Sequence, residues 1–147
     1  MNAPDLTKRP PRSARCRLGG FSVLPRLLDK CRATLAAANG EYHYNCPLDQ
    51  RFLEFVGIDH ERLKTEVAKG NGDGEVLDWI LANATHHRTE PEILQWSAWR
   101  DGAAPGDHES RDFFNQMHQQ YGPNRTDIIT WNDLLDLDDH VSFGGKA

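Results

Sequence analysis

The sequence predicts an all-α fold, a single compact, irregular bundle of about six or seven short helices with an extended basic N-terminal arm. Apolar residues recur at helical spacing in nearly every segment after residue 20, and residues that start or stop helices bound these segments. The longest run that alternates like a strand is the short stretch Glu41 to Tyr44. We therefore expect one domain, with an arm at residues 1–20 that packs on a helical body at 21–140, and a tail at 141–147.

The arm differs in charge from the rest of the chain. Through Arg32 there are eight lysines and arginines against two aspartates, a net charge of +6, whereas the remainder carries −11. Such an arm could reach for nucleic acid, but it meets the acidic surface of its own chain at high effective concentration. Packing on the body is therefore the favoured interpretation, and weak nucleic-acid binding is a second alternative.

The first helix is expected between Ser22 and Gly40, after a break at Gly19 and Gly20. Pro25 suits the first turn of a helix, and Asn39 followed by Gly40 is a stop signal. An apolar stripe is predicted at helical spacing, formed by Leu24, Leu28, Cys31 and Leu35. Three cations lie off this stripe and are expected to face solvent or a partner, namely Arg26, Lys30 and Arg32.

Later helices are expected at residues 47–57, 59–70, 73–84, 89–99, 109–122 and 130–139. Capping boxes at Thr89 and Thr130 mark two of the starts. The segments 59–70 and 73–84 have the outline of a DNA-binding helix-turn-helix, but the second of them has acidic residues and no lysine or arginine. DNA phosphates would repel that helix, so we interpret the pair as an ordinary helical hairpin.

The stretch "GEYHYNCPLDQRF" contains the candidates for catalysis. Pro47 suits the first helical position, so Cys46 is the expected N-cap and Asp49 the third helical residue. A thiol at a positive helix end is a candidate nucleophile, and His43 is a candidate general base. A single His and a single Cys do not complete a metal site, so neither a metal nor a cofactor is expected. A buried, unreactive Cys46 and a structural His43 are the favoured alternatives.

The composition indicates the cellular compartment of the protein. No apolar run approaches the ~20 residues that span a bilayer, and no apolar segment follows the basic N-terminus as in a secretory signal. Three cysteines, an odd number, favour free thiols. We therefore expect a cytoplasmic protein without membrane contact, while its oligomeric state stays open.

Four stretches together resemble the uncharacterised bacterial family called domain of unknown function 5069: "DLTKRPPRSARCRLGGF", "LPRLLDKCRATLA", "GEYHYNCPLDQRFLEF" and "EVAKGNGDGEVLDWI". The resemblance covers most of the chain and is most specific in the N-terminal half. It implies a compact cytosolic single-domain protein, and it implies no activity and no catalytic residues. One departure is Cys16, which stands where the family more usually has an aliphatic residue.

Because the arm and the "GEYHYNCPLD" turn both resemble defining segments of that family, we expect them to be neighbours in space. Arginines beside a helix N-terminus would make an anion site. The expected ligand-binding residues are Arg9, Arg12, Arg15, Tyr42, His43 and Cys46.

The competing hypothesis, which we favour for the arginines, is that the arm pairs with the chain's own carboxylates. The function is therefore unknown from sequence, with a binding or interaction module for a small anionic ligand or a protein partner as the first hypothesis. An enzyme that uses His43, Cys46 and Asp49 is the alternative.

Overall fold

The computed structural model describes residues 3–147, which fold into seven helices and one two-stranded sheet. The all-α prediction is confirmed. The helices are α1 (Leu24–Leu35), α2 (Pro47–Val56), α3 (His60–Val67), α4 (Asp73–Asn83), α5 (Glu90–Asp101), α6 (His108–Tyr121) and α7 (Trp131–Ser142).

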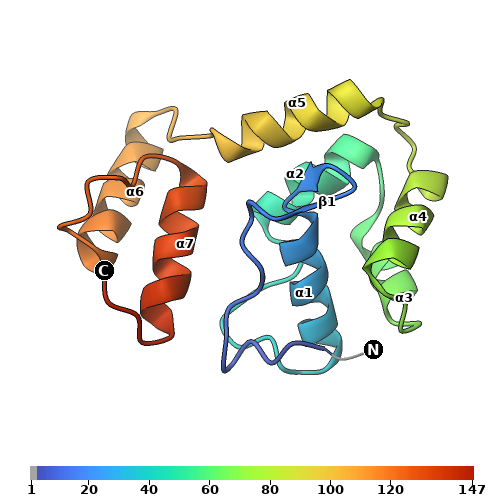
Figure 1. Cartoon of the computed structure of the whole chain (residues 1–147), viewed down its shortest axis with the longest axis horizontal. Coiled ribbons are helices and arrows are strands. Elements are labelled where there is room, and N and C mark those ends of the chain that lie inside the picture. Colours follow the sequence, from blue (N-terminus) through green and yellow to red (C-terminus); the bar gives the residue numbers. More distant parts are fainter. Residues whose placement is uncertain (1–2) are drawn as a thin grey trace.

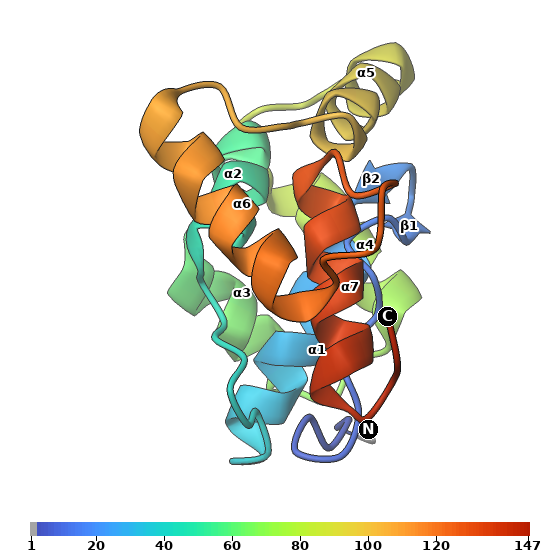
Figure 2. The ribbon, with the colours of Figure 1, turned by 90° about the vertical axis from the view of Figure 1, so that its left-hand side faces the viewer.

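The helices are arranged around α1. In Figure 1, α3 and α4 lie on one side of α1, the pair α6 and α7 lies on the other, and α5 runs across the top between them. Figure 2 shows α6 and α7 side by side. The N-terminal end of α5 therefore lies toward α4, and its C-terminal end lies toward α6 and α7.

A small hairpin that the sequence interpretation missed precedes α1. Strand β1 (Arg17–Leu18) pairs antiparallel with β2 (Phe21–Ser22), with Arg17 opposite Ser22. The two-residue turn is Gly19 and Gly20, both at positive φ, which a tight hairpin turn of this length requires. Strands of two residues are too short to show an alternating pattern, so only the glycine pair signals them.

The main core forms where α1 meets its neighbours. Its largest fully buried members include Phe21, Leu24, Leu28 and Phe52. Cys31 belongs to this core, as predicted, and burial raises the pKa of its thiol to about 12. A second, smaller cluster joins α6 to α7 through Phe114, Ile128, Leu134 and Leu137.

The arm runs along α1 in the opposite direction. The Leu6 N–H donates to the carbonyl of Ala38, beyond the C-terminal end of α1, and the Val23 N–H at its N-terminal end donates to the carbonyl of Ala14. Leu6 and Ala14 are both buried. These contacts hold the arm along α1, so that Arg12 lies against α1 and α4, and Arg15 lies against α7.

Candidate functional site

Three of the four arginines of the arm contact aspartates of the body. Arg12 donates to Asp29 from Nε at 3.1 Å and from Nη2 at 2.9 Å, and its Nη1 lies 2.7 Å from Asp73 Oδ2. Burial alone would lower the pKa of Arg12, but the hydrogen bonds to both aspartates raise it. Arg9 has an exposed side chain, and among residues 3–147 only its backbone N–H makes a hydrogen bond, to the carbonyl of Asp5.

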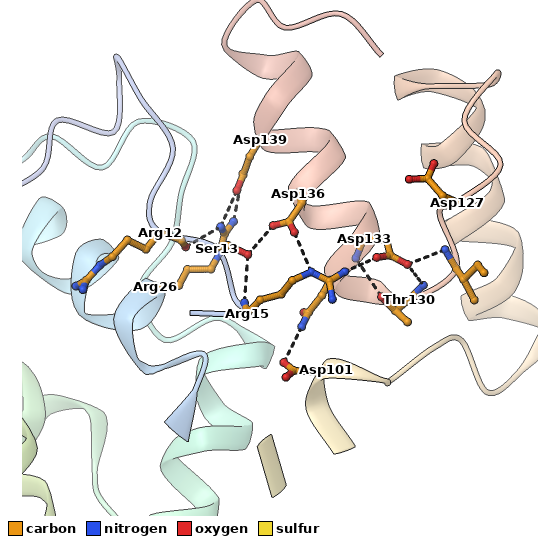
Figure 3. Close-up of polar contacts among 12 residues, drawn as sticks. Arg12, Ser13, Arg15, Arg26, Asp101, Asp127, Thr130, Asp133, Asp136 and Asp139 are labelled. Atoms are coloured by element: carbon orange, nitrogen blue, oxygen red, sulfur yellow. Dashed lines mark hydrogen bonds and ion pairs between the residues drawn. The ribbon is translucent and has the colours of Figure 1, made fainter. Parts of the chain in front are cut away.

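A second set of contacts joins the arm to α7 (Figure 3). Ser13 Oγ donates to Asp136 Oδ1 at 2.7 Å, and Arg15 Nε donates to Asp136 Oδ2 at 3.0 Å. Arg15 also pairs with Asp133. Arg17 Nη2 donates to Asp101 Oδ2, at the end of α5, at 2.8 Å. The arm arginines that make these bonds are therefore committed to the chain's own carboxylates.

The three cations of α1 do not face solvent, so that prediction is wrong. Arg26, Lys30 and Arg32 are only 4%, 3% and 7% exposed. Each is buried because it meets a carboxylate from another segment, and the three partners are Asp139 at 2.7 Å, Asp49 at 2.8 Å and Asp73 at 2.6 Å. Sequence periodicity does not show these partners, since each lies far away along the chain.

Asp73 connects the arm to α1 and α4, and it gives a prediction on pH. Burial would raise the pKa of Asp73, but hydrogen bonds from Arg12 and Arg32 lower it below its usual value. A lowered folded-state pKa stabilises the protein above the unfolded-state value, about 3.9, and this contribution is lost as pH falls through the folded value. We expect Asp73→Asn to destabilise the protein at pH 7 and to have a much smaller effect near pH 2.

Urea unfolding of the wild type and the variant at a series of pH values checks this expectation. Asp78→Asn is the matched control, because Asp78 lies on the same helix with an exposed side chain. A difference between wild type and Asp73→Asn that stays constant from pH 7 to pH 2 would contradict the prediction.

The residues of the "GEYHYNCPLD" segment are distributed over separate environments. Tyr42 donates its hydroxyl to Asp139 Oδ1 at 2.7 Å, and burial, followed by that hydrogen bond, raises the pKa of Tyr42. His43 is exposed. Cys46 is the N-cap of α2, as predicted, and its Sγ accepts a hydrogen bond from Lys30 Nζ at 3.1 Å. Asp49 is fully buried against the same lysine.

The structure therefore links Cys46 and Asp49 through Lys30, but it does not bring them together with His43. Within residues 3–147, Arg12 and Arg15 hydrogen-bond to aspartates rather than to Cys46 or Pro47. The same residues contain no group of three or more His, Cys, Asp or Glu side chains that could hold a metal ion.

A pocket lies on the other side of the α2 N-terminus, with a volume of about 650 Å³. Its walls come from the start of α2, the end of α5, the loop before α6, and the starts of α6 and α7. The lining residues are Pro47, Leu48, Arg51, Trp99, Arg100, Gly102, Ala103, Ala104, Gly106, Asp107, Ser110, Trp131, Asn132 and Leu135.

The two cations of this pocket are close to one tryptophan. The guanidinium carbon of Arg51 lies 5.9 Å from the centroid of the Trp99 ring, and that of Arg100 lies 4.9 Å from it. Both distances are within cation–π range. No ion pair joins either arginine to a carboxylate within the described part of the chain, although an exposed carboxylate, that of Asp107, also lines the pocket.

Arg100 occupies a core position of α5. It is only 6% exposed and lies on the same buried helix face as Ile93 and Ser97. Its Nε atom is buried without a hydrogen-bond partner. Burial, and then repulsion from Arg51, lowers the pKa of Arg100. The nearest helix neighbour, Asp101, already accepts hydrogen bonds from Arg17 and Asn132.

The N-terminus of α2 adds positive potential to the pocket. Helix α2 begins at Pro47, and its N-cap Cys46 makes no side-chain cap hydrogen bond. The first-turn N–H groups of α2 therefore receive no bond from the cap side chain, and together with the helix dipole they favour an anion nearby. The acidic residue of this first turn, Asp49, is paired with Lys30. Helix α7 also begins at the pocket, but Thr130 and Asp133 cap its first turn.

Sequence reasoning did not find Arg51 and Arg100. The signal for Arg100 was its spacing, because Ile93, Ser97 and Arg100 fall on one helix face. A cation on a buried face requires a group that compensates its charge. Arg51 follows Pro47 by four residues, which places both on one face of α2. No signal in the sequence links the two arginines to each other.

Comparison with known proteins identifies the family. A search of curated proteins found no match. None of the helices in the described chain is long and apolar enough to cross a membrane. The model of the family described as Domain of unknown function (DUF5069) matches residues 8–141. With nearly the whole chain matched, the protein belongs to this family, as the resemblance of its N-terminal segments suggests.

Proposed function

We propose that the protein is a binding module that holds a small anionic ligand in the pocket between α2, α5 and α7. The site lies at the helix N-terminus that follows Cys46, and Arg51 and Arg100 supply its positive charge. The arm arginines that pair with aspartates have a structural part in this proposal. Arg12 and Arg15 hold the arm against the body and against α7.

One observation carries the proposal, the buried guanidinium of Arg100 without a carboxylate partner. The effective cost of burying a charge is several kcal/mol unless a partner compensates it. The chain meets this requirement at Arg26, Lys30 and Arg32, each of which pairs with an aspartate. Arg100 is as well buried as they are, yet it borders a pocket instead. An anionic ligand in that pocket would supply the missing charge.

The second cation supports the same assignment. Two guanidinium groups that repel each other raise the energy of the empty pocket, and an anion between them removes that repulsion. Arginine also presents several N–H donors in a planar group suited to carboxylate or phosphate. A module of this kind needs no metal and no cofactor.

The test is a thermal-shift titration of the full chain with inorganic phosphate, pyrophosphate and sulfate. We expect at least one of these anions to raise the unfolding temperature, since a ligand that binds only the folded state stabilises it. Arg100→Met should lower the affinity for that anion by at least about tenfold, which is the effect of losing a charged hydrogen bond. Without the anion the same variant should be as stable as the wild type or more so, because an unpaired buried charge is gone.

Arg51→Gln should lower the affinity for the anion as well. Arg62→Gln is the matched control and should leave that affinity unchanged. Arg62 is exposed and lies 5.7 Å from the Trp79 ring centroid, outside the pocket, so it reproduces the cation–π setting of Arg51. The proposal fails if no anion stabilises the wild type, or if Arg100→Met and Arg51→Gln bind the anion as tightly as the wild type does.

The enzyme alternative depends on one contact, that of Lys30 Nζ with Cys46 Sγ. A cysteine sulfur held by a lysine is a candidate nucleophile only where a reagent can reach it in the folded protein. Alkylation of the folded protein with iodoacetamide, followed by mapping of the modified cysteines, tests this alternative. Labelling of Cys46 only after unfolding would exclude a nucleophilic role.

A further inference from the structure

We infer that the ligand of the pocket is an aromatic anion, in which a flat aromatic ring system is joined, directly or through a sugar, to a single carboxylate or phosphate group. The inference rests on the proposed function, since it takes Arg51 and Arg100 as the anion-binding pair. It adds the chemical class of the remainder of the ligand, which comes from the other walls of the pocket.

Position restricts the ligand first. Both guanidinium carbons lie within 6 Å of the centroid of the Trp99 ring, at 5.9 and 4.9 Å. An anionic group that contacts both arginines must therefore lie beside that indole. Trp99 is 53% exposed, so much of its surface is available for contact. A ligand bound through its charge is consequently placed against an aromatic surface.

Size is the second restriction. The volume of about 650 Å³ falls in the usual range of pockets for organic ligands, about 300–1,000 Å³. Inorganic phosphate would fill only a small part of it. The remaining space is bordered by apolar groups, among them Leu48, Leu135 and Ala103. Water left against these walls is unfavourable, so the ligand needs an apolar body.

The chemistry of the walls indicates a flat, aromatic body. A second indole, Trp131, lines the pocket from α7, and an edge-to-face contact with Phe114 at 5.3 Å fixes its ring. Indole rings form favourable offset stacks with other aromatic rings, and a guanidinium plane stacks on them as well. Two indoles and two arginines around one pocket thus favour an aromatic ring over an aliphatic chain of the same size.

Two sources share this chemistry, a nucleoside monophosphate and an aromatic carboxylate. Isothermal titration calorimetry of the full chain distinguishes them with AMP, 2-naphthoate, adenosine, cyclohexanecarboxylate and inorganic phosphate as probes. We expect AMP or 2-naphthoate to bind at least about tenfold more tightly than inorganic phosphate and cyclohexanecarboxylate, the gain expected from one stacked ring. Adenosine, which has the ring without the charge, should bind at least about tenfold more weakly than the better anion, the effect of losing a charged hydrogen bond. Tighter binding of AMP favours a nucleoside monophosphate as the natural ligand, and tighter binding of 2-naphthoate favours an aromatic carboxylate.

Variants of the two tryptophans separate stacking from charge. Trp99→Leu should weaken binding of the better aromatic anion about tenfold more than it weakens binding of inorganic phosphate, because phosphate has no ring to stack on the indole. Trp79→Leu is the matched control, since Trp79 also lies under an arginine but outside the pocket. Equal binding of phosphate and the aromatic anions would overturn this inference while leaving the anion site intact. Absence of binding by every anion would overturn the proposed function itself.

Discussion

Replacing Asp139 with alanine is expected to lower the free energy of unfolding by about 3–5 kcal/mol, because it leaves a buried arginine without its counter-charge. Arg26 Nη1 lies 2.7 Å from Asp139 Oδ2, and Nη2 lies 3.3 Å from Oδ1. Tyr42 donates its hydroxyl to the same carboxylate. Alanine removes the acceptor of all three bonds, and solvent cannot replace it around an arginine that is 4% exposed.

Urea denaturation followed by circular dichroism measures the loss. The double variant Arg26→Leu with Asp139→Leu should recover much of the stability, since an apolar pair of similar size avoids the cost of burying two charges. Ser142→Ala is the control on α7, because it removes only an exposed hydrogen bond to Asp138. A loss below about 1 kcal/mol for Asp139→Ala would show that the pair is solvated, as surface ion pairs are.

This pair also explains how the α6–α7 unit is attached. The small apolar cluster of Phe114, Ile128, Leu134 and Leu137 joins these two helices to each other. Polar bonds from Arg26, Arg15 and Ser13 join α7 to α1 and to the arm. Since the pocket has walls on α2 and α5 as well as on α6 and α7, its shape depends on these bonds.

The helices were predictable because their signals are local. Pro47 and Gly57 bound α2 within one short stretch, and Gly57 adopts the left-handed conformation expected of a helix stop. Thr89 and Thr130 form their capping boxes as predicted. At α4 the N-cap is Gly72, and Asp73 is the first helical residue. The side chain of Asp73 binds Arg12 and Arg32.

The burial of the α1 cations was not predictable in the same way. Arg26 and Asp139 are separated by 113 positions, and Arg32 and Asp73 by 41. A charged residue on a helix normally indicates a solvent-exposed face. Only the tertiary structure shows that an aspartate lies opposite each of these cations. The positive net charge of the N-terminal part and the negative net charge of the remainder did indicate that the arm would pair with carboxylates of the body.

The candidate site is harder still to predict, because it is formed by segments that have no local relation. Arg51 comes from α2, Arg100 from α5 and Trp131 from α7. The sequence correctly identified the start of α2 at Pro47, with Cys46 as the N-cap residue, and this helix start is one wall of the pocket. It did not identify the cations there, since a buried arginine without a carboxylate can be recognised only when its neighbours are known.

Replacing Asp49 with alanine should also cost about 3–5 kcal/mol, for the same reason as at Asp139. Lys30 Nζ lies 2.8 Å from Asp49 Oδ2, and the two side chains are 3% and 0% exposed. The same oxygen accepts the Asn45 N–H, which shapes the turn that leads into α2. Alanine would leave Lys30 with the Cys46 sulfur, at 3.1 Å, and the turn without its acceptor.

Urea denaturation measures this loss, and Glu54→Ala is the control on the same helix because Glu54 is exposed. The double variant Lys30→Met with Asp49→Ala should be more stable than Asp49→Ala alone, since it removes the uncompensated charge. If the two are equally unstable, the cost of Asp49→Ala comes from the turn at Asn45 rather than from the lysine. The ion pair would then have no large part in holding α2 against α1.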